Sequence, residues 1–489
     1  MTMAGAVSNL GLMESANQTL PDSPAGSDTL LNSSVALHAF LTRFIAALPL
    51  IPLLLHAAAP VQMGAREQPT RELRKIVRGP YLQLGTPTAI TIRWRTDKPT
   101  SSLVRYGPAP DRLLHTVSAD GITRDHVIEL SGLMPGTRYF YTVGSREGVS
   151  AGGDEDHFFM TAPPPGHQKP TRIWVLGDSG TQNKSARSVR DAYATFSIAR
   201  SADLWLMLGD NAYTSGKDSE YQGALFEMYA RPLRSAVLWP TLGNHDARSA
   251  NSTNQTGPYF DIFTLPTFGQ AGGAPSGTEA FYSFDHASIH FICLDSAASD
   301  LSENGPMLEW LRRDLGANTK TWTIAYLHHP PYTHGGHDSD NDADSDGIMR
   351  LVRENIVPII EQGGVDVVLS GHSHNYERSF LLDGFYGSID AFTDAHKRSR
   401  GDGRVFGDGP YVKSGAPPAP HAGTVYVVAG SSGKTHKFPK FKHPAMVAGI
   451  HTLGSLVIDV YGSRLDATFL DDKGDQRDDF TIIKKLKTP

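Results

Sequence analysis

The sequence predicts an all-β sandwich followed by an α/β domain that is built on mixed sheets. Short strand-like runs separated by turn residues fill residues 79–163, and this spacing is typical of a β-sandwich. From Thr171 onward, short apolar runs alternate with segments of helical periodicity, which indicates strands that alternate with helices. The segment Pro163-Pro164-Pro165-Gly166 lies between the two regions, and we interpret it as a linker.

In the first region, five strand-like runs are separated by turn signals such as Pro135-Gly136. These runs are Ala89–Arg95, Ser102–Tyr106, His126–Leu130, Tyr139–Val143 and His157–Thr161. We therefore expect a sandwich domain over residues 79–163.

The second region is expected to span residues 170–480. Its predicted strands are residues 173–176, 204–208, 324–327, 365–369 and 425–429, with a hairpin over 280–294. Its predicted helices lie near residues 189–196, 308–315 and 348–360, and the last one is expected to bend at Pro358. Residues 386–420 are rich in Gly, Pro and charged residues, so we expect a surface insertion there.

Residues 1–78 are expected to be a disordered or signal-like leader. An apolar run over residues 44–55 follows Arg43 and precedes three alanines, which is the pattern of a signal-peptide core. The run is shorter than the roughly 20 residues that a membrane span needs. We therefore expect an exported protein (secreted, periplasmic or cell-surface) without a stable membrane span, and a membrane anchor over Ala36–Ala59 is the alternative.

Composition excludes several classes of function. The formal net charge of the 489-residue chain is −6, which argues against a nucleic-acid partner, because such binding needs a basic surface. The single cysteine, Cys293, excludes an internal disulfide and a zinc site built on cysteines.

Five short polar segments carry the candidate chemistry, and at least four of them directly follow a strand-like run. They are Gly177-Asp178-Ser179-Gly180, Gly209-Asp210-Asn211-Ala212-Tyr213, Gly243-Asn244-His245-Asp246, Ala325-Tyr326-Leu327-His328 and Gly371-His372-Ser373-His374. Taken alone, a Gly-Asp pair after a strand is usually a turn or a helix cap. Loops at strand ends are where α/β folds place their sites, so the five segments together indicate one shared cleft.

The order of these segments resembles the calcineurin-like metallophosphoesterase superfamily and, within it, the purple acid phosphatases. The segments His328-His329-Pro330-Pro331-Tyr332 and Gly371–Arg378 are further specific matches. The resemblance covers residues 79–480. It implies a fibronectin-III-like N-terminal domain, an α-β-β-α sandwich as the catalytic domain and a centre of two metal ions.

The resemblance also implies a set of metal ligands. One ion would take Asp178, Asp210, Tyr213 and His374, and the second would take Asp210, Asn244, His328 and His372, with Asp210 bridging the two. Carboxylate, phenolate and imidazole suit Fe(III), whereas imidazole, amide and carboxylate suit Zn, Mn(II) or Fe(II). Tyr213 is the residue that best separates the phosphomonoesterase interpretation from the phosphodiesterase interpretation, because many relatives that hydrolyse diesters carry another residue there. A packed aromatic side chain is the structural alternative for Tyr213.

His245 and His337 are the candidate catalytic residues. His245 resembles the substrate-binding acid of the family, and His337 falls where plant-type members place a substrate-contacting histidine. Asp338 follows it where those members have a second histidine, so the role of His337 and the substrate preference stay open. His334 is the alternative to His337.

Other polar residues near the motifs receive structural interpretations. We expect His329 to pack behind the ligands, Asp246 to orient His245 or cap a turn, and Arg378 to touch phosphate or form an ion pair within its loop. The acidic run over residues 342–347 begins like an EF-hand loop, but Arg353 stands where the calcium loop needs a glutamate. We therefore expect this run to cap a helix that starts near Ile348.

These observations favour an acid phosphatase that hydrolyses small phosphomonoesters with a dinuclear Fe(III)–M(II) centre, where M is Zn, Fe or Mn. The first alternative is a phosphodiesterase that acts on nucleotide or lipid-derived diesters. Tyr213 speaks against that alternative, and Asp338 leaves room for it. The second alternative is a non-catalytic metal-binding protein that recognises a surface partner, and the presence of every implied ligand speaks against it.

Overall fold

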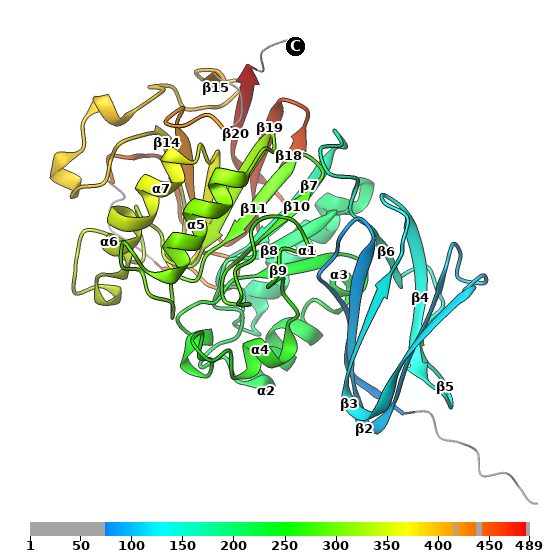
Figure 1. Ribbon diagram of the computed structural model, residues 1–489. Coiled ribbons are helices and arrows are strands. Elements are labelled where there is room, and N and C mark those ends of the chain that lie inside the picture. The colour runs from blue at the N-terminus through cyan, green and yellow to red at the C-terminus, as the bar shows by residue number, and fades with distance from the viewer. Residues whose placement is uncertain (1–73, 415–417, 437–442, 486–489) are drawn as a thin grey trace, which may run out of the picture. The chain divides into compact units, whose positions relative to one another are not determined.

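The computed structural model describes residues 74–414, 418–436 and 443–485 (Figure 1). Nearly all of the leader that was predicted over residues 1–78, including its apolar run, therefore lies outside the described residues. Among the residues described, no helix has the length and apolar character to cross a membrane.

The N-terminal region is an antiparallel β-structure, as the sequence predicts. Its strands are β1 (Ile76–Gln83), β2 (Ala89–Gly107), β3 (His115–Ser131), β4 (Arg138–Ser145), β5 (Gly148–Gly152) and β6 (Phe158–Met160). The hydrogen-bonded order is β1-β2-β4-β5, with β3 paired to β2 and β6 paired to β4. Ile90, Ile92 and Trp94 place their apolar side chains on one face of β2, and Thr91 and Arg93 between them are buried as well.

Two boundaries in this region differ from the sequence-based expectation. The strand β2 runs through both of the strands that were predicted between Ala89 and Tyr106. The strand β1 begins at Ile76, inside the predicted leader. Its buried Arg78 donates hydrogen bonds to the Asp218 carboxylate at 2.8 and 3.0 Å, so the first strand is held by a partner 140 residues further along the chain.

The second region contains two seven-stranded sheets. One has the order β10 (Tyr282–His286), β11 (Ile289–Cys293), β12 (Trp322–Leu327), β13 (Val367–Ser370), β16 (Thr424–Ala429), β14 (Tyr376–Leu382) and β17 (Met446–Ile450). The other has the order β15 (Tyr411–Ser414), β20 (Gln476–Lys485), β19 (Arg464–Asp471), β18 (Gly454–Tyr461), β7 (Thr171–Leu176), β8 (Leu204–Met207) and β9 (Val237–Pro240). Strands β7, β8 and β9 are parallel, and so are β11, β12, β13 and β16.

Helices cover the sheets and complete the predicted α-β-β-α layering (Figure 1). The longest are α1 (Lys184–Phe196) and α5 (Pro306–Ala317), and the shorter ones are α2 (Asp218–Tyr221), α3 (Ala230–Leu233), α4 (Pro258–Ile262), α6 (Ile348–Leu351) and α7 (Val357–Gln362). Helix α1 packs on β18 and β19, α5 contacts α7, and β16 of one sheet contacts β18 of the other. The two sheets therefore share a core that is closed on the outside by helices.

Two further expectations are refined. The helix predicted over 348–360 contains a π-helical turn at Val352–Ile356, and Pro358 lies directly after that turn, at the beginning of α7. The segment 386–420 is not only a surface insertion, because its strand β15 pairs in parallel with β20 and buries Tyr411.

Candidate metal centre

Polar loops from both sheets meet at one edge of the fold. Asp178, Asp210 and Asn244 follow the parallel strands β7, β8 and β9, while His328 and His372 follow β12 and β13. The carboxyl ends of parallel strands lie on the same side of a sheet, and ligand sites form there. The structure thus gathers the side chains that the sequence analysis implied as ligands.

The first half of the cluster contains Asp178, Tyr213 and His374. Tyr213 Oη lies 3.0 Å from Asp178 Oδ1 and 3.3 Å from His374 Nε2. Burial raises the pKa of the Tyr213 phenol well above its usual range, and the Asp178 and Asp210 carboxylates raise it further. A neutral phenol against two carboxylates becomes an anionic ligand only when a cation binds between these groups.

The second half contains Asn244, His328 and His372. His328 Nε2 lies 3.0 Å from Asn244 Oδ1, 3.2 Å from His372 Nδ1 and 3.6 Å from Asp210 Oδ1. Asp210 therefore faces this half, and it also lies with Asp178 and His374 in a group whose ligand atoms are within 4.8 Å of one another. This shared position is the one that a bridging carboxylate requires.

The outer hydrogen bonds decide which ring nitrogens keep a lone pair. His328 Nδ1 contacts Leu208 O at 2.8 Å, and a carbonyl can only accept, so Nδ1 carries a hydrogen and, in the neutral ring, Nε2 is the bare nitrogen. Ser345 Oγ donates its one hydrogen to Asp344 Oδ1 at 2.8 Å. It must therefore accept from His372 Nε2, which lies 2.6 Å away, and this leaves His372 Nδ1 bare.

When both rings are neutral, two bare imidazole nitrogens and an amide oxygen thus face one another inside the protein. Such acceptors repel unless a proton or a metal cation lies between them, because buried polar atoms need a partner. Burial by itself lowers the pKa of His328, but the carboxylates of Asp210 and Asp178 outweigh it and raise the pKa. The cluster therefore attracts positive charge, and its donor set of imidazole, amide and carboxylate fits a transition-metal ion.

Glycines before the ligands are required by the tight approach of the loops. A Cβ atom at Gly243 would lie 2.1 Å from Asp210 N and 2.3 Å from Asp210 Oδ1. At Gly209, where φ is +89°, a Cβ atom would lie 2.5 Å from His328 Nδ1. These contacts are shorter than any van der Waals contact, so the ligand positions depend on the absence of side chains here.

Asp246 joins two ligand loops, and of its two predicted roles its contacts fit the capping of a turn and not the orienting of His245. Its buried carboxylate accepts hydrogen bonds from the backbone N–H groups of Asn211 at 3.1 Å, Ala212 at 3.2 Å and Gly243 at 3.0 Å. Tyr221 Oη also donates to it, at 2.7 Å. Burial and the nearby Asp210 raise its pKa to about 7. Asp246 thus fixes the loop after β8 against the loop after β9.

His245 lies at the rim of the cluster. Its Nδ1 contacts the carbonyl oxygen of Thr214 at 2.7 Å and therefore carries a hydrogen. Its Nε2 lies 3.9 Å from Asp210 Oδ2, and its ring packs edge-on against Tyr213 with centroids 4.5 Å apart. The Nε2 nitrogen is therefore the one that faces the centre.

His337 lies against the cluster, as the sequence analysis expected, whereas His334 pairs elsewhere. The His337 ring stacks on His372 with centroids 3.9 Å apart, and its Nδ1 lies 2.7 Å from Asp344 Oδ1. His334 Nε2 lies 3.8 Å from Asp338 Oδ2. Of the two candidates, His337 is the one that contacts a predicted ligand.

Several residues that support the centre were missed by sequence reasoning. Asp344 hydrogen-bonds to His337 and Ser345 hydrogen-bonds to His372, whereas the sequence analysis expected this acidic run to cap a helix. Gly347 occupies the N-cap position of α6, with no side-chain cap. His436 Nε2 lies 3.2 Å from His374 Nδ1, and the spacing of 62 residues between them offers no sequence signal.

Two neighbouring residues have structural roles. His329 is buried, and its Nδ1 lies 3.0 Å from Ser296 Oγ, behind the ligands. Arg378 is buried and donates to the Asp478 carboxylate at 2.6 and 3.0 Å. Its ion pair is with β20 and not with its own loop, so Arg378 joins the two sheets and is not free to touch phosphate.

Family models match both regions of the chain. A model described as calcineurin-like phosphoesterase matches residues 171–376. A model described as purple acid phosphatase, N-terminal domain, matches residues 77–161.

Curated relatives are acid phosphatases by name. Acid phosphatase type 7 of Mus musculus is 28% identical over 65% of this chain and 74% of its own length. Purple acid phosphatase 15 of Arabidopsis thaliana is 27% identical over 52% of this chain and 49% of its own length. The matches thus span from about half to about three quarters of these relatives.

Solved structures share the fold. The purple acid phosphatase PPD1 from yellow lupin (Lupinus luteus) superposes with a TM-score of 0.63 and 17% identity, over 83% of this chain and 75% of that one. PhoD superposes with a TM-score of 0.54 and 13% identity, over 82% of this chain and 89% of that one.

Replacing Gly243 with alanine should weaken metal binding. The added methyl group collides with Asp210 N and Oδ1, so the loop after β9 must move away from the centre, and we expect at least a tenfold loss of affinity, of the order seen for disturbed ligand partners. Metal content after dialysis against graded chelator measures this. Gly316→Ala is the matched control, since a Cβ atom there meets nothing within 4 Å. Equal retention by both variants would contradict the argument.

Proposed function

The chain belongs to the purple acid phosphatases within the calcineurin-like phosphoesterases, and from this membership we propose that it hydrolyses phosphomonoesters with a dinuclear Fe(III)–M(II) centre. Members of this class are hydrolases that act on phosphate esters. The observation that carries the finer proposal is the Tyr213 phenol, which lies 3.0 Å from Asp178 Oδ1 and 3.3 Å from His374 Nε2. Phenolate, carboxylate and imidazole together favour a hard trivalent ion over a divalent one.

The proposed ligands follow from the two halves of the cluster. Asp178, Tyr213 and His374 would hold Fe(III), and Asn244, His328 and His372 would hold Zn, Fe(II) or Mn(II), with Asp210 shared by both ions. Two ions of this kind supply Lewis acidity and lower the pKa of water, so a nucleophile is available in acid.

The charge of the site suits an anionic substrate. Ionised Asp178, Asp210 and Tyr213 contribute three negative charges, fewer than the five positive charges of a trivalent and a divalent ion together. The loaded site therefore attracts a phosphate ester although the whole chain carries a formal net charge of −6.

The chain's own imidazoles supply proton transfer and substrate contacts. His245 donates from Nδ1 to Thr214 O, so its Nε2 is aimed at the centre, where the imidazolium form can give the Nε2 proton to the leaving oxygen and become neutral. His337 uses Nδ1 for Asp344, so its Nε2 is the nitrogen left for the substrate. We assign His245 as the acid and His337 as a phosphate-contacting residue.

A phosphodiesterase acting on nucleotide or lipid-derived diesters is the second candidate. One observation favours it: Asp338 replaces a histidine and faces His334, 3.8 Å away. The centre therefore has one imidazole fewer on this side to balance the charge of a substrate. A phosphomonoester carries more negative charge than a diester, so this loss disfavours the monoester more.

We also propose that the protein is exported. The apolar run over residues 44–55, with Arg43 before it and alanines after it, supports this proposal. Expression of the full chain, followed by mass spectrometry of the N-terminus in the exported fraction, tests it. A product that keeps Met1 and stays with the cytoplasm would refute export.

Replacing Asp210 with alanine should abolish activity and lower the metal content of both half-sites. Both halves lose the same carboxylate, so we expect kcat/KM to fall by at least about 100-fold. Metal analysis and steady-state rates measure the effect. Asp342→Ala is the control, because that carboxylate is exposed and pairs with Arg350. Full activity in Asp210→Ala would refute the bridging role.

Replacing Tyr213 with phenylalanine should bleach the visible band of the iron-loaded protein. The band arises from charge transfer between a phenolate and Fe(III), and the variant has no phenolate at this position. Visible absorption at matched iron content measures the change, with the exposed Tyr461→Phe as control. An unchanged band would rule out the iron–phenolate assignment.

A comparison of an aryl phosphomonoester with the matching bis-aryl diester, from acid to alkaline pH, separates the two candidate functions. We expect the monoester to be hydrolysed faster, with an acid optimum, because a trivalent ion makes the nucleophile available at low pH. A preference for the diester, or an alkaline optimum, would leave the metal centre in place and transfer the assignment to the phosphodiesterase.

A further inference from the structure

The loop that follows β16, residues 430–436, lies against the Tyr213–His374 half of the centre. Its Gly430 N–H donates to Asn375 O at 3.1 Å, and its Ser432 N–H donates to Gly177 O at 3.1 Å. Gly433 O accepts from Asn183 Nδ2 at 3.2 Å. The loop is therefore fixed to both neighbouring ligand loops, and the side chains that it carries have defined positions.

Lys434 is the cation of this loop. Its Nζ lies 4.0 Å from the centroid of the Tyr213 ring, and the His245 ring packs against the same tyrosine with centroids 4.5 Å apart. The ion pairs of the described residues include none with Lys434. The described attractive partner of its charge is thus the face of an aromatic ring. Burial lowers the pKa of the nearby His436 imidazole, and the charges of His374 and Lys434 lower it further.

A lysine on an aromatic face is available for a stronger partner. The cation–π attraction at a partly exposed site is weak, whereas a charge-assisted hydrogen bond to a phosphate oxygen is about twice as strong as a neutral one. The side chain has a compact charge on a flexible four-carbon stem. It can therefore leave the ring for a phosphoryl oxygen that is bound beside Tyr213.

Carboxylates on the other side of the ligand set favour a cation at this position. The position that holds a second histidine in plant-type relatives is Asp338 here, and its carboxylate faces His334. Asp344 contributes a further carboxylate beside His337. One side of the cleft is therefore acidic, and Lys434 brings positive charge from the side of Tyr213.

We propose that Lys434 contacts the phosphoryl group of the substrate and of the released phosphate from the Tyr213 side of the centre. The proposal rests on the dinuclear centre of the proposed function and adds a ligand-binding residue from a loop outside the family motifs. The chemistry recognised is a phosphoryl oxyanion, whether it belongs to an ester or to free phosphate.

Binding of inorganic phosphate to the metal-loaded full chain tests the proposal without relying on turnover. Isothermal titration calorimetry would compare wild type, Lys434→Met and Lys434→Arg, with affinities referred to the metal-loaded fraction. We expect Lys434→Met to weaken phosphate binding about tenfold, the effect of losing one charged hydrogen bond. Lys434→Arg should stay within about threefold of wild type because it keeps the charge.

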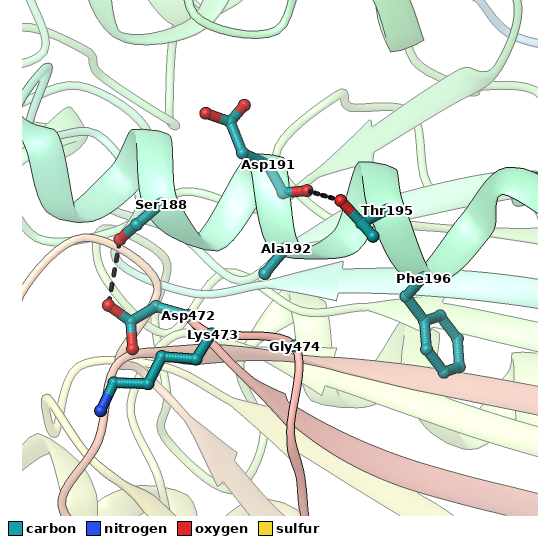
Figure 2. Close-up of a pocket in the computed structure, with 8 residues that line it drawn as sticks. All are labelled: Ser188, Asp191, Ala192, Thr195, Phe196, Asp472, Lys473 and Gly474. Carbon is teal, nitrogen blue, oxygen red and sulfur yellow. Dashed lines mark hydrogen bonds between the residues drawn. The ribbon is translucent and has the colours of Figure 1, made fainter.

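Lys473→Met is the matched control. Lys473 is an exposed lysine in the turn after β19, where it lines a surface hollow with Ser188 and Asp472 (Figure 2). Figure 2 shows that hollow beside α1, and none of the proposed metal ligands line it. Removing its charge should leave phosphate affinity unchanged.

Two results would overturn the proposal. One is a phosphate affinity of Lys434→Met within twofold of wild type. The other is an equal loss in Lys434→Met and Lys473→Met, which would show a general charge effect. A wild-type protein that binds phosphate and fails to hydrolyse monoesters would refute the proposed function alone, because the binding comparison can still be made.

Discussion

Polar ligand atoms that are buried around one point are the constraint on which this structure depends. His328 Nε2 and His372 Nδ1 are 3.2 Å apart, and the Asn244 oxygen lies 3.0 Å from the first of them. Burying such a set without a cation costs free energy. Ion binding and folding are therefore linked, because an ion that binds only the folded chain stabilises it by mass action.

Each of these imidazoles has a polar partner at its outer nitrogen, on the side away from the centre. Leu208 O takes the hydrogen of His328, Ser345 takes that of His372, and His436 contacts the outer nitrogen of His374. Such outer partners fix both the tautomer and the orientation of a ligand. The loops themselves are secured in the same way, since Asp246 binds backbone N–H groups on either side of the centre.

The fold class, and the side chains that the structure brings together in one cluster, could be predicted from the sequence because both depend on local patterns. Each proposed ligand lies in a short motif directly after a strand, and strand order brings such motifs together. The outer partners could not be predicted in this way. Leu208 contributes only a backbone oxygen, and His436 meets His374 across 62 residues. The pairing of β15 with β20 was missed for the same reason, because it joins segments about 70 residues apart whose partner no local pattern specifies.

Asp338 stands where plant-type relatives have a histidine, and this difference changes the charge around the proposed metal centre. Its backbone N–H donates to Asp344 Oδ2 at 2.8 Å, while Asp344 Oδ1 lies 2.7 Å from His337 Nδ1. One carboxylate therefore orders the loop and orients the remaining imidazole at once. A phosphomonoester carries more negative charge than a diester, so a cleft that keeps one imidazole on this side needs positive charge from elsewhere. The trivalent ion that the hard ligands around Tyr213 favour would supply that charge, and so would Lys434 above the Tyr213 ring, both from the opposite half of the ligand set. The proposed monoester preference is therefore compatible with an aspartate at position 338.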